Sequence, residues 1–208
     1  MVLGDAYVRA LHGATLLALL VGPLAAPRPE PCAGSPLCSC RDKHMSCIAV
    51  PLHRFPEWPQ IELQHLDISM SNLEVLSESA LDGLKLQTLV LVANKLHNIE
   101  PHAFSSMAVT LASLDLGYND FTEIPQQGLK DLKVLNWLNL QNNNIAHVDP
   151  EIRWHHLEDT LTSLSLSNNQ VRALPPRALS ALRRLLQLDL EGNLLRSISP
   201  DSLPPSLT

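Results

Sequence analysis

Apolar and polar residues follow a fixed order that returns six times along the chain. The clearest copy is residues 135–145, LNWLNLQNNNI, which has the form LxxLxLxxNxL. The template restarts at intervals of 23, 25, 24, 26 and 24 residues, from Leu63 through Leu86, Leu111, Leu135 and Leu161 to Leu185, and a truncated seventh copy opens at Leu207. Six matches in near-constant register indicate a repeat protein in which each copy adds one structural unit.

The leucine positions predict one short strand per copy. Because side chains alternate between the two faces of a strand, Leu138 and Leu140 point inward while Trp137, Asn139 and Gln141 point outward. Units that stack side by side pair these strands in parallel at about 4.8 Å, so six strands form a sheet of roughly 25 Å. The outward residues of all units then share one face of that sheet.

An asparagine follows the strand in five of the six copies, and its role is predicted to be structural. The turn that leaves the strand carries backbone N–H and C=O groups into the interior, and a carboxamide satisfies both kinds. Ser71 occupies this position in the first copy, so the first unit is expected to depend on whatever precedes it. The five asparagines are Asn94, Asn119, Asn143, Asn169 and Asn193.

The second half of each unit predicts a convex side made of loops, extended segments and single helical turns. Two further apolar positions close each coil, and a proline follows the second of them in five copies, where no donated hydrogen bond is needed. The unit that begins at Leu135 is the longest, so a small bulge is expected in its segment 151–157.

Composition narrows the class of protein. The chain of 208 residues is 45% hydrophobic and only 4% aromatic, so its core must be mainly leucine. The formal charge of −6 and the lack of a Lys/Arg cluster argue against nucleic-acid binding.

The N-terminus reads as a secretory signal peptide at residues 1–26. It has one basic residue, an apolar run over residues 14–21, and Ala25 and Ala26 before a proline-rich stretch. A membrane anchor is the weaker reading because the run is shorter than the ~20 residues that span a bilayer. No later stretch is long and apolar enough, so membrane attachment would need an anchor in a further C-terminal part.

All four cysteines lie between residues 32 and 47, before the first repeat. An even number in a secreted chain predicts two disulfides, with three possible connectivities, whereas the spacing of Cys38 and Cys40 is too short for a zinc knuckle. Residues 27–60 are therefore expected to form a proline-rich leader and a disulfide-bonded cap that covers the first coil. Six repeats fill residues 61–206, and residues 207–208 start another.

These motifs resemble the extracellular leucine-rich repeat proteins of the roughly 24-residue class. The resemblance covers residues 32–208 and implies an α/β repeat fold: a right-handed solenoid with a parallel concave β-sheet, a mostly loop-built convex side and a disulfide-bonded N-terminal cap. It also implies the disulfide pairs Cys32–Cys40 and Cys38–Cys47. Residues 114–125 look like repeats of chaoptin-type adhesion proteins, and the LPPSL ending looks like small matrix proteoglycans.

The outward strand positions are where a binding site is expected. They offer a rigid row of side chains that the core does not use, polar and mildly acidic without Lys or Arg. Trp137 lies at the middle, and a large aromatic among small polar residues is typical of a binding hot spot. An alternative is that Trp137 only covers its neighbours. The predicted binding residues are Val90, Asp115, Tyr118, Trp137, Asn139, Ser163 and Ser165.

No catalytic, metal or cofactor site is predicted. The adjacent pair His155 and His156 lies on a convex loop without an HExxH motif, and Ser163, Ser165 and Ser167 lack a His–acid partner at matching height. The sequence therefore predicts a secreted or cell-surface protein-binding module of adhesion or receptor type with an unidentified protein ligand. The alternative is a structural matrix component of small-proteoglycan type.

Overall fold

The computed structural model describes the backbone of residues 30–32 and 35–36 and the complete residues 37–52, 55 and 62–207. The expected signal peptide and most of the junction between cap and repeats lie outside these residues. The elements are β1 (Glu30–Cys32), β2 (Ser35–Arg41), β3 (His44–Ser46), β4 (His65–Asp67), β5 (Val75–Leu76), β6 (Thr88–Val90), β7 (Asn98–Ile99), η1 (Ser105–Met107), β8 (Ser113–Asp115), α1 (Gln126–Leu129), β9 (Trp137–Asn139), η2 (His155–Asp159), β10 (Ser163–Ser165), β11 (Gln187–Asp189), η3 (Pro200–Ser202) and η4 (Pro205–Leu207).

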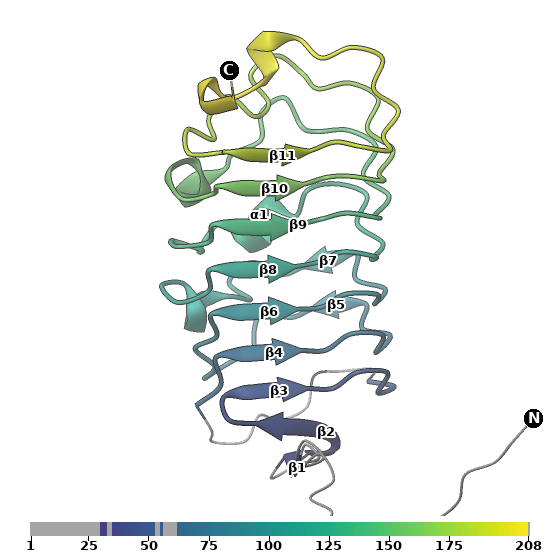
Figure 1. The fold of residues 1–208 in the computed structure, drawn as a ribbon, viewed down its shortest axis with the longest axis vertical. Helices are drawn as coiled ribbons and strands as arrows, with labels where there is room; N and C mark the ends of the chain where they lie inside the picture. The colour runs from purple at the N-terminus through teal and green to yellow at the C-terminus, as the bar shows by residue number, and fades with distance from the viewer. Residues whose placement is uncertain (1–29, 33–34, 53–54, 56–61, 208) are drawn as a thin grey trace, which may run out of the picture.

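The strands stack as the rungs of one long sheet (Figure 1). The order is β1-β2-β3-β4-β6-β8-β9-β10-β11, and every pair from β3 onward is parallel. A small parallel pair, β5 and β7, lies on the other side of the coil. The helices are short, as the sequence predicted, and the solenoid fold is confirmed.

The cap adds strands that the repeat pattern does not contain. β3 pairs in parallel with β4, so the parallel part of the sheet has seven strands instead of the six predicted. Met45 occupies the leucine position of β3 and is 1% exposed, because its side chain packs as the leucines of the repeats do. β1 and β2 then continue the sheet in antiparallel orientation.

One disulfide of the cap is visible in the described residues. Cys38 in β2 bonds to Cys47 directly after β3. Cys40 is disulfide-bonded as well, but the expected pairing with Cys32 rests on a side chain outside the described part. The bond holds the β2–β3 hairpin against the first turn, where so small a cap has little core of its own.

The core is a set of leucine ladders that run the length of the stack. Leu66, Leu89, Leu114 and Leu138 occupy one register position and are each at most 1% exposed. Burial of a leucine contributes about 1.5–3 kcal/mol relative to exposure. In the last described turn the equivalent Leu188 is only partly buried, because β11 has a neighbour on one side.

The asparagines form a second ladder, which ties each turn to the one before it. Asn143 is typical: its Nδ2 donates to the carbonyls of Leu116 and Leu140, both at 3.0 Å, and its Oδ1 accepts from the N–H of Phe121 at 3.1 Å. Asn94, Asn119, Asn169 and Asn193 repeat these contacts in their own turns. Ser71 instead donates to the carbonyl of Cys47, so the first turn is hydrogen-bonded to the cap as expected.

The residue before each of the six ladder positions has a left-handed backbone, and so does Ala49 at the equivalent place in the cap. The seven φ values lie between 52° and 68°, in Ala49, Met70, Ala93, Tyr118, Asn142, Asn168 and Gly192. Glycine and asparagine are the residues that adopt this conformation at low cost, and a bulky side chain costs about 1–2 kcal/mol there. Met70 and Tyr118 are the two bulky residues in this set.

The convex side is irregular and tightly packed. In α1 the backbone of Gly128 lies so close to Ile99 that an added Cβ would be 2.4 Å from Ile99 Cγ2. The bulge predicted at 151–157 is a turn that buries Trp154, whose Nε1 donates to the carbonyl of Ala178 at 2.9 Å.

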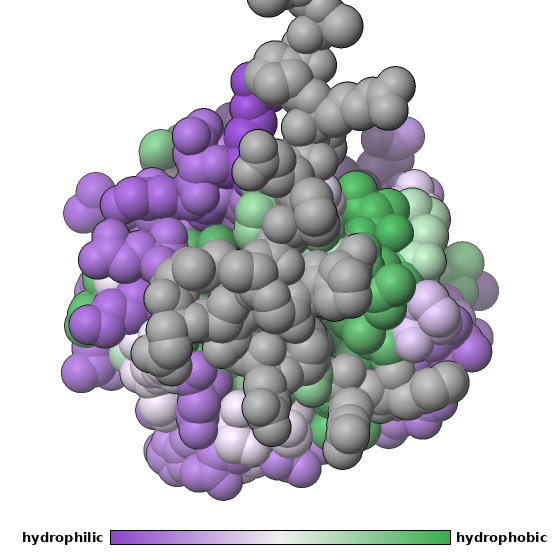
Figure 2. All heavy atoms as spheres, turned by 90° about the horizontal axis from the view of Figure 1, so that it is seen from below, coloured by the Kyte–Doolittle hydropathy of each residue, from purple (hydrophilic) through white to green (hydrophobic). Residues whose placement is uncertain are grey.

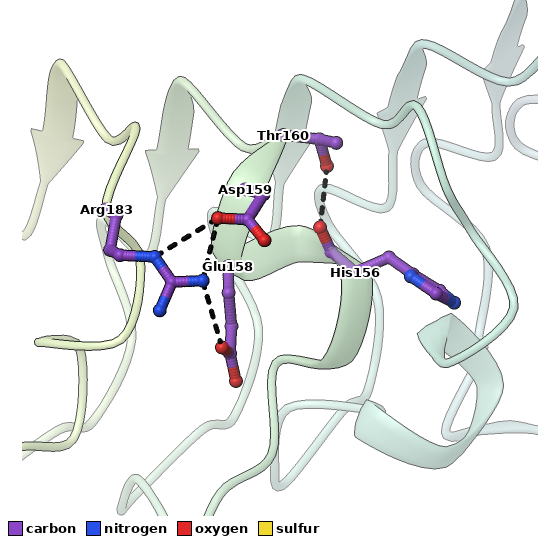
Figure 3. Close-up of polar contacts among 5 residues, drawn as sticks. All are labelled: His156, Glu158, Asp159, Thr160 and Arg183. Atoms are coloured by element: carbon purple, nitrogen blue, oxygen red, sulfur yellow. Dashed lines mark hydrogen bonds and ion pairs between the residues drawn. The ribbon is translucent and has the colours of Figure 1, made fainter.

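Arg183 fixes η2 of this bulge to the next turn. Its Nη2 lies 2.7 Å from Asp159 Oδ1 and 3.7 Å from Glu158 Oε2 (Figure 3). Thr160 Oγ1 also donates to the carbonyl of His156 at 3.2 Å. The side chains of His155 and His156 remain exposed on this convex loop.

Candidate functional site

The register of the parallel sheet sorts the concave face into three columns. The first column follows the starts of the strands, the second their ends, and the third the residues just beyond. From cap to C-terminal turn the first is His44, His65, Thr88, Ser113, Trp137, Ser163, Gln187; the second is Ser46, Asp67, Val90, Asp115, Asn139, Ser165, Asp189; and the third is Ile48, Ser69, Val92, Gly117, Gln141, Ser167, Glu191.

Trp137 stands in the first column between two serines. The register pairs it with Ser113 on one side and Ser163 on the other, and the side chain is partly buried. Two small hydroxyl residues leave the indole without a large neighbour in its own column. The ring is therefore a broad apolar element within a polar column.

Asn139 is not a free outward residue, which corrects the prediction for it. Its side chain is 5% exposed: Nδ2 donates to Asp115 Oδ1 at 2.9 Å, and Oδ1 accepts from the N–H of Gln141 at 3.0 Å. The sequence pattern treats every outward position as exposed, but neighbouring strands at about 4.8 Å cover a short side chain between them. Asn139 orients Asp115 and offers little contact area of its own.

Asp115 is held in place by two donors. Its Oδ1 accepts from Asn139 Nδ2 and, at 3.0 Å, from the N–H of Gly117. Burial raises the pKa of Asp115 above its usual value, the two hydrogen bonds oppose that rise, and the charge of Asp67 adds a smaller increase in the pKa. Its Oδ2 has no hydrogen bond within the described residues.

The serines of β10 are engaged with one another and with an acid. Ser165 Oγ lies 3.0 Å from Ser167 Oγ and 3.4 Å from Asp189 Oδ2, and Ser163 is partly buried beside Trp137. The histidines of the concave face, His44 and His65, are at the cap end. Four strand spacings separate β4 from β10, or about 19 Å, so the serines of β10 form no couple with these histidines.

Tyr118 does not share a site with Trp137. It lies five residues beyond Ser113, the register partner of Trp137, which places the two aromatics roughly 15 Å apart along the strand direction. Tyr118 instead lies at the rim where the turns leave the sheet, and its side chain is 53% exposed. Val90 lies in the second column, half-buried between Asp67 and Asp115.

The structure reveals surface residues that the repeat pattern missed. Met70 is 53% exposed on the same rim as Tyr118, and Ile48, at the cap end of the third column, is 50% exposed. They were missed because the cap does not match the template and because Met70 falls on a turn position. His44 and His65 also meet, with ring centroids 4.2 Å apart, and burial and then the charge of His44 lower the pKa of His65.

Other chemistry is not built into the described residues. Their His, Cys, Asp and Glu side chains form no group of three placed to hold a metal ion. None of the helices in the described ranges has the length and hydropathy needed to cross a membrane. The three columns hold four acidic residues and no Lys or Arg, so the face is a polar, acidic surface with Trp137 and an apolar rim.

The chain matches a known family model and several known proteins. The model for the leucine rich repeat matches residues 85–145, 109–155 and 159–204, which together are more than half of the chain. Tsukushi of Mus musculus is 31% identical over 147 residues, covering 64% of this chain and 40% of that protein. The chain spans less than half the length of the curated relatives it matches.

Solved structures share the fold. Human 5T4, also called trophoblast glycoprotein, superposes with a TM-score of 0.63 at 23% identity, covering 77% of this chain and 63% of that one. A structure of TLR13 in complex with ssRNA13 has a TM-score of 0.54 at 26% identity, covering 70% of this chain and 24% of that one. The RNA belongs to that distant protein. The concave face here carries no Lys or Arg with which to neutralise phosphates.

Proposed function

We propose that this chain, which belongs to the leucine-rich repeat family, is an extracellular protein-binding module of adhesion or receptor type that engages a protein ligand through its concave face. Members of this family are generally binding modules without enzymatic activity. The observation that carries this proposal is Trp137, a partly buried indole between two serines on a rigid parallel sheet. Large aromatics near the centre of a surface supply much of the binding energy in protein interfaces.

The extracellular location is part of the proposal. Cys38–Cys47 is a disulfide, Cys40 is disulfide-bonded too, and such bonds persist in oxidising compartments. The relatives Tsukushi and human 5T4 are extracellular leucine-rich repeat proteins. The proposed organisation is a signal peptide at 1–26, a leader and cap at 27–60, and repeats from 61 onward.

The concave face is preorganised for contact with a partner. Hydrogen bonds within the second column and between the second and third columns hold Asp115, Asn139 and Ser165 in fixed positions, so little side-chain entropy remains to be lost on binding. The backbone beneath is fixed by the asparagine ladder. The convex side, by contrast, consists of turns that differ from one repeat to the next.

The test is a screen of the secreted chain against an array of purified extracellular domains and matrix polymers. A partner found there is measured against Trp137→Ala and, as a control on the convex side, Glu151→Gln. We expect Trp137→Ala to weaken binding by about 2 kcal/mol, or roughly thirtyfold, as for an interface hot spot, while Glu151→Gln leaves it unchanged. Equal affinities of a folded Trp137→Ala variant and the wild type would refute the concave site.

The same screen addresses the matrix alternative. A structural matrix component binds a matrix polymer, whereas an adhesion or receptor module binds the ectodomain of another protein. The class of the partner therefore decides between them.

A further inference from the structure

The surface over β6 combines an acidic pair with an apolar rim. In the second column Val90 lies between Asp67 and Asp115, one strand spacing from each, so the two carboxylates are about 10 Å apart across an apolar floor. At the rim Ala93 lies in the same way between Met70 and Tyr118. The β6 turn thus presents an apolar strip of Val90 and Ala93, with larger side chains on the strands on both sides of it.

The residue types at the rim are explained neither by the core nor by the backbone. Met70 and Tyr118 are each 53% exposed and sit at left-handed positions with φ near 55°. Asn142 and Asn168 fill the same position in later turns at lower conformational cost. An exposed bulky side chain at a strained position points to contact with another molecule.

The carboxylates are uncompensated within the described residues. Asp67 and Asp115 have no ion-pair partner there. Asp67 accepts a hydrogen bond at Oδ1 from Ser69 Oγ. Asp115 accepts at Oδ1 from the N–H of Gly117 and from Asn139 Nδ2, so in this described part of the chain the Oδ2 atom of each aspartate is unused. The columns hold no Lys or Arg that could supply the missing charge. A cationic group of a partner would meet a charge here that no described residue already neutralises.

Apolar surface extends from this strip toward the cap. Ile48, half-exposed, lies next to Ser69 in the third column, which also holds Val92. Figure 2, which looks onto the cap end of the stack, shows apolar residues gathered on one flank and hydrophilic residues on the opposite one. Apart from Trp137, the apolar residues of the columns and the rim, Ile48, Ala49, Met70, Val90, Val92, Ala93 and Tyr118, all belong to the turns of β3 to β8.

We propose that the β6 surface recognises a partner segment that carries a lysine or arginine beside a large apolar side chain. The aliphatic stem of the cation lies on Val90 with its charged end between Asp67 and Asp115. The apolar side chain packs on Ala93 between Met70 and Tyr118, about 10 Å further along the strand direction. This inference rests on the proposed function and specifies the chemistry of the ligand.

The experiment is a selection from a random linear peptide library displayed on phage, with the full secreted chain as the target. The same library is also selected against three variants as targets: Asp67→Ser/Asp115→Asn, Met70→Ser/Tyr118→Ser, and Glu151→Gln, which removes one negative charge from the convex side. Serine is used at position 67 because an asparagine there, followed by Ile68 and Ser69, would create a glycosylation acceptor. Asparagine at 115 keeps an oxygen for the two donors that now meet Asp115.

We expect the wild type and Glu151→Gln to enrich peptides with a cationic residue near an aliphatic or aromatic one. The acidic double variant should lose the cationic preference and bind the best wild-type peptide at least about tenfold more weakly in fluorescence anisotropy. The rim double variant should lose the apolar preference. Circular dichroism of each variant establishes that it is folded.

Three results would overturn the inference. One is the absence of enrichment on the wild type. Another is a set of enriched peptides whose charge is unaffected by the loss of Asp67 and Asp115. The third is a concentration-dependent dimer in light scattering that the rim variant dissociates, since the occupant would then be a second copy. If the array partner depends on Trp137 but not on the β6 residues, the proposed function stands and this inference fails alone.

Discussion

The ladder asparagines allow a sharp test because residues 142–144 are three consecutive asparagines in different environments. Asn143 is 6% exposed and carries the hydrogen bonds between turns, whereas Asn144 is exposed and accepts one bond from Gln170 Nε2 at 3.2 Å. The same substitution, Asn→Ala, therefore removes the same atoms from a buried and a solvent-exposed position. Any difference in the free energy of unfolding reports the ladder.

The expected cost at Asn143 follows from its partners. Without the carboxamide the N–H of Phe121 loses its Oδ1 acceptor, and an orphaned buried donor costs about 1–3 kcal/mol. The carbonyls of Leu116 and Leu140 each lose a donor but keep one, from Asn119 and Asn169 respectively. At about 1 kcal/mol for each lost bond, the total for Asn143→Ala is about 3–5 kcal/mol. Asn144→Ala should change stability by less than about 0.5 kcal/mol.

The assay is urea unfolding of the full chain with its disulfides intact, followed by far-ultraviolet circular dichroism and by tryptophan fluorescence. Coincident transitions establish that the free energies can be compared. Separate transitions would show that the stack divides at the altered turn, as neighbour-coupled repeats allow. A difference below about 1 kcal/mol between the two variants would contradict the assignment of the ladder as the element that joins the turns.

Three further predictions concern single positions. Because the pKa of Asp115 is raised, the wild type loses stability as the pH rises from the ordinary carboxyl value of 3.8 through the raised pKa. In thermal scans Asp115→Asn should therefore melt at a higher temperature than the wild type at pH 7, and the difference in melting temperature should close at lower pH. A difference that stays constant with pH would refute this prediction. Gly128→Ala should lower the free energy of unfolding by about 1–3 kcal/mol, because its Cβ overlaps Ile99, whereas Gln127→Ala on the exposed side of α1 should be neutral in the same urea titration. Tyr118→Asn should raise the urea midpoint by relieving about 1 kcal/mol of left-handed strain while weakening partner binding, and a lower midpoint would show that the side chain supports the fold.

The binding surface was only partly predictable from the sequence. The template separates inward from outward positions, and it correctly places Trp137, Asp115 and Val90 on the concave face. It assigns no burial to outward residues, so Asn139 was expected to be free although its neighbours enclose it. It also gives no distance across units, so Tyr118 was assigned to Trp137 when it belongs to the rim with Met70.

The repeat alone determined the architecture. A leucine spacing that recurs every 23–26 residues forces each unit to bury its apolar side against the next, and the asparagine position supplies the hydrogen bonds that the turns need. Both requirements are local and periodic, so the sequence shows them directly. Which outward residues lie beside one another depends on the register of parallel strands about 24 residues apart. The template aligns Asp67, Val90 and Asp115 at one position, and the structure confirms that register. The enclosure of Asn139 by its neighbours and the distance of Tyr118 from Trp137 depend on side-chain packing and on the path of the turns, so only the tertiary structure decides them.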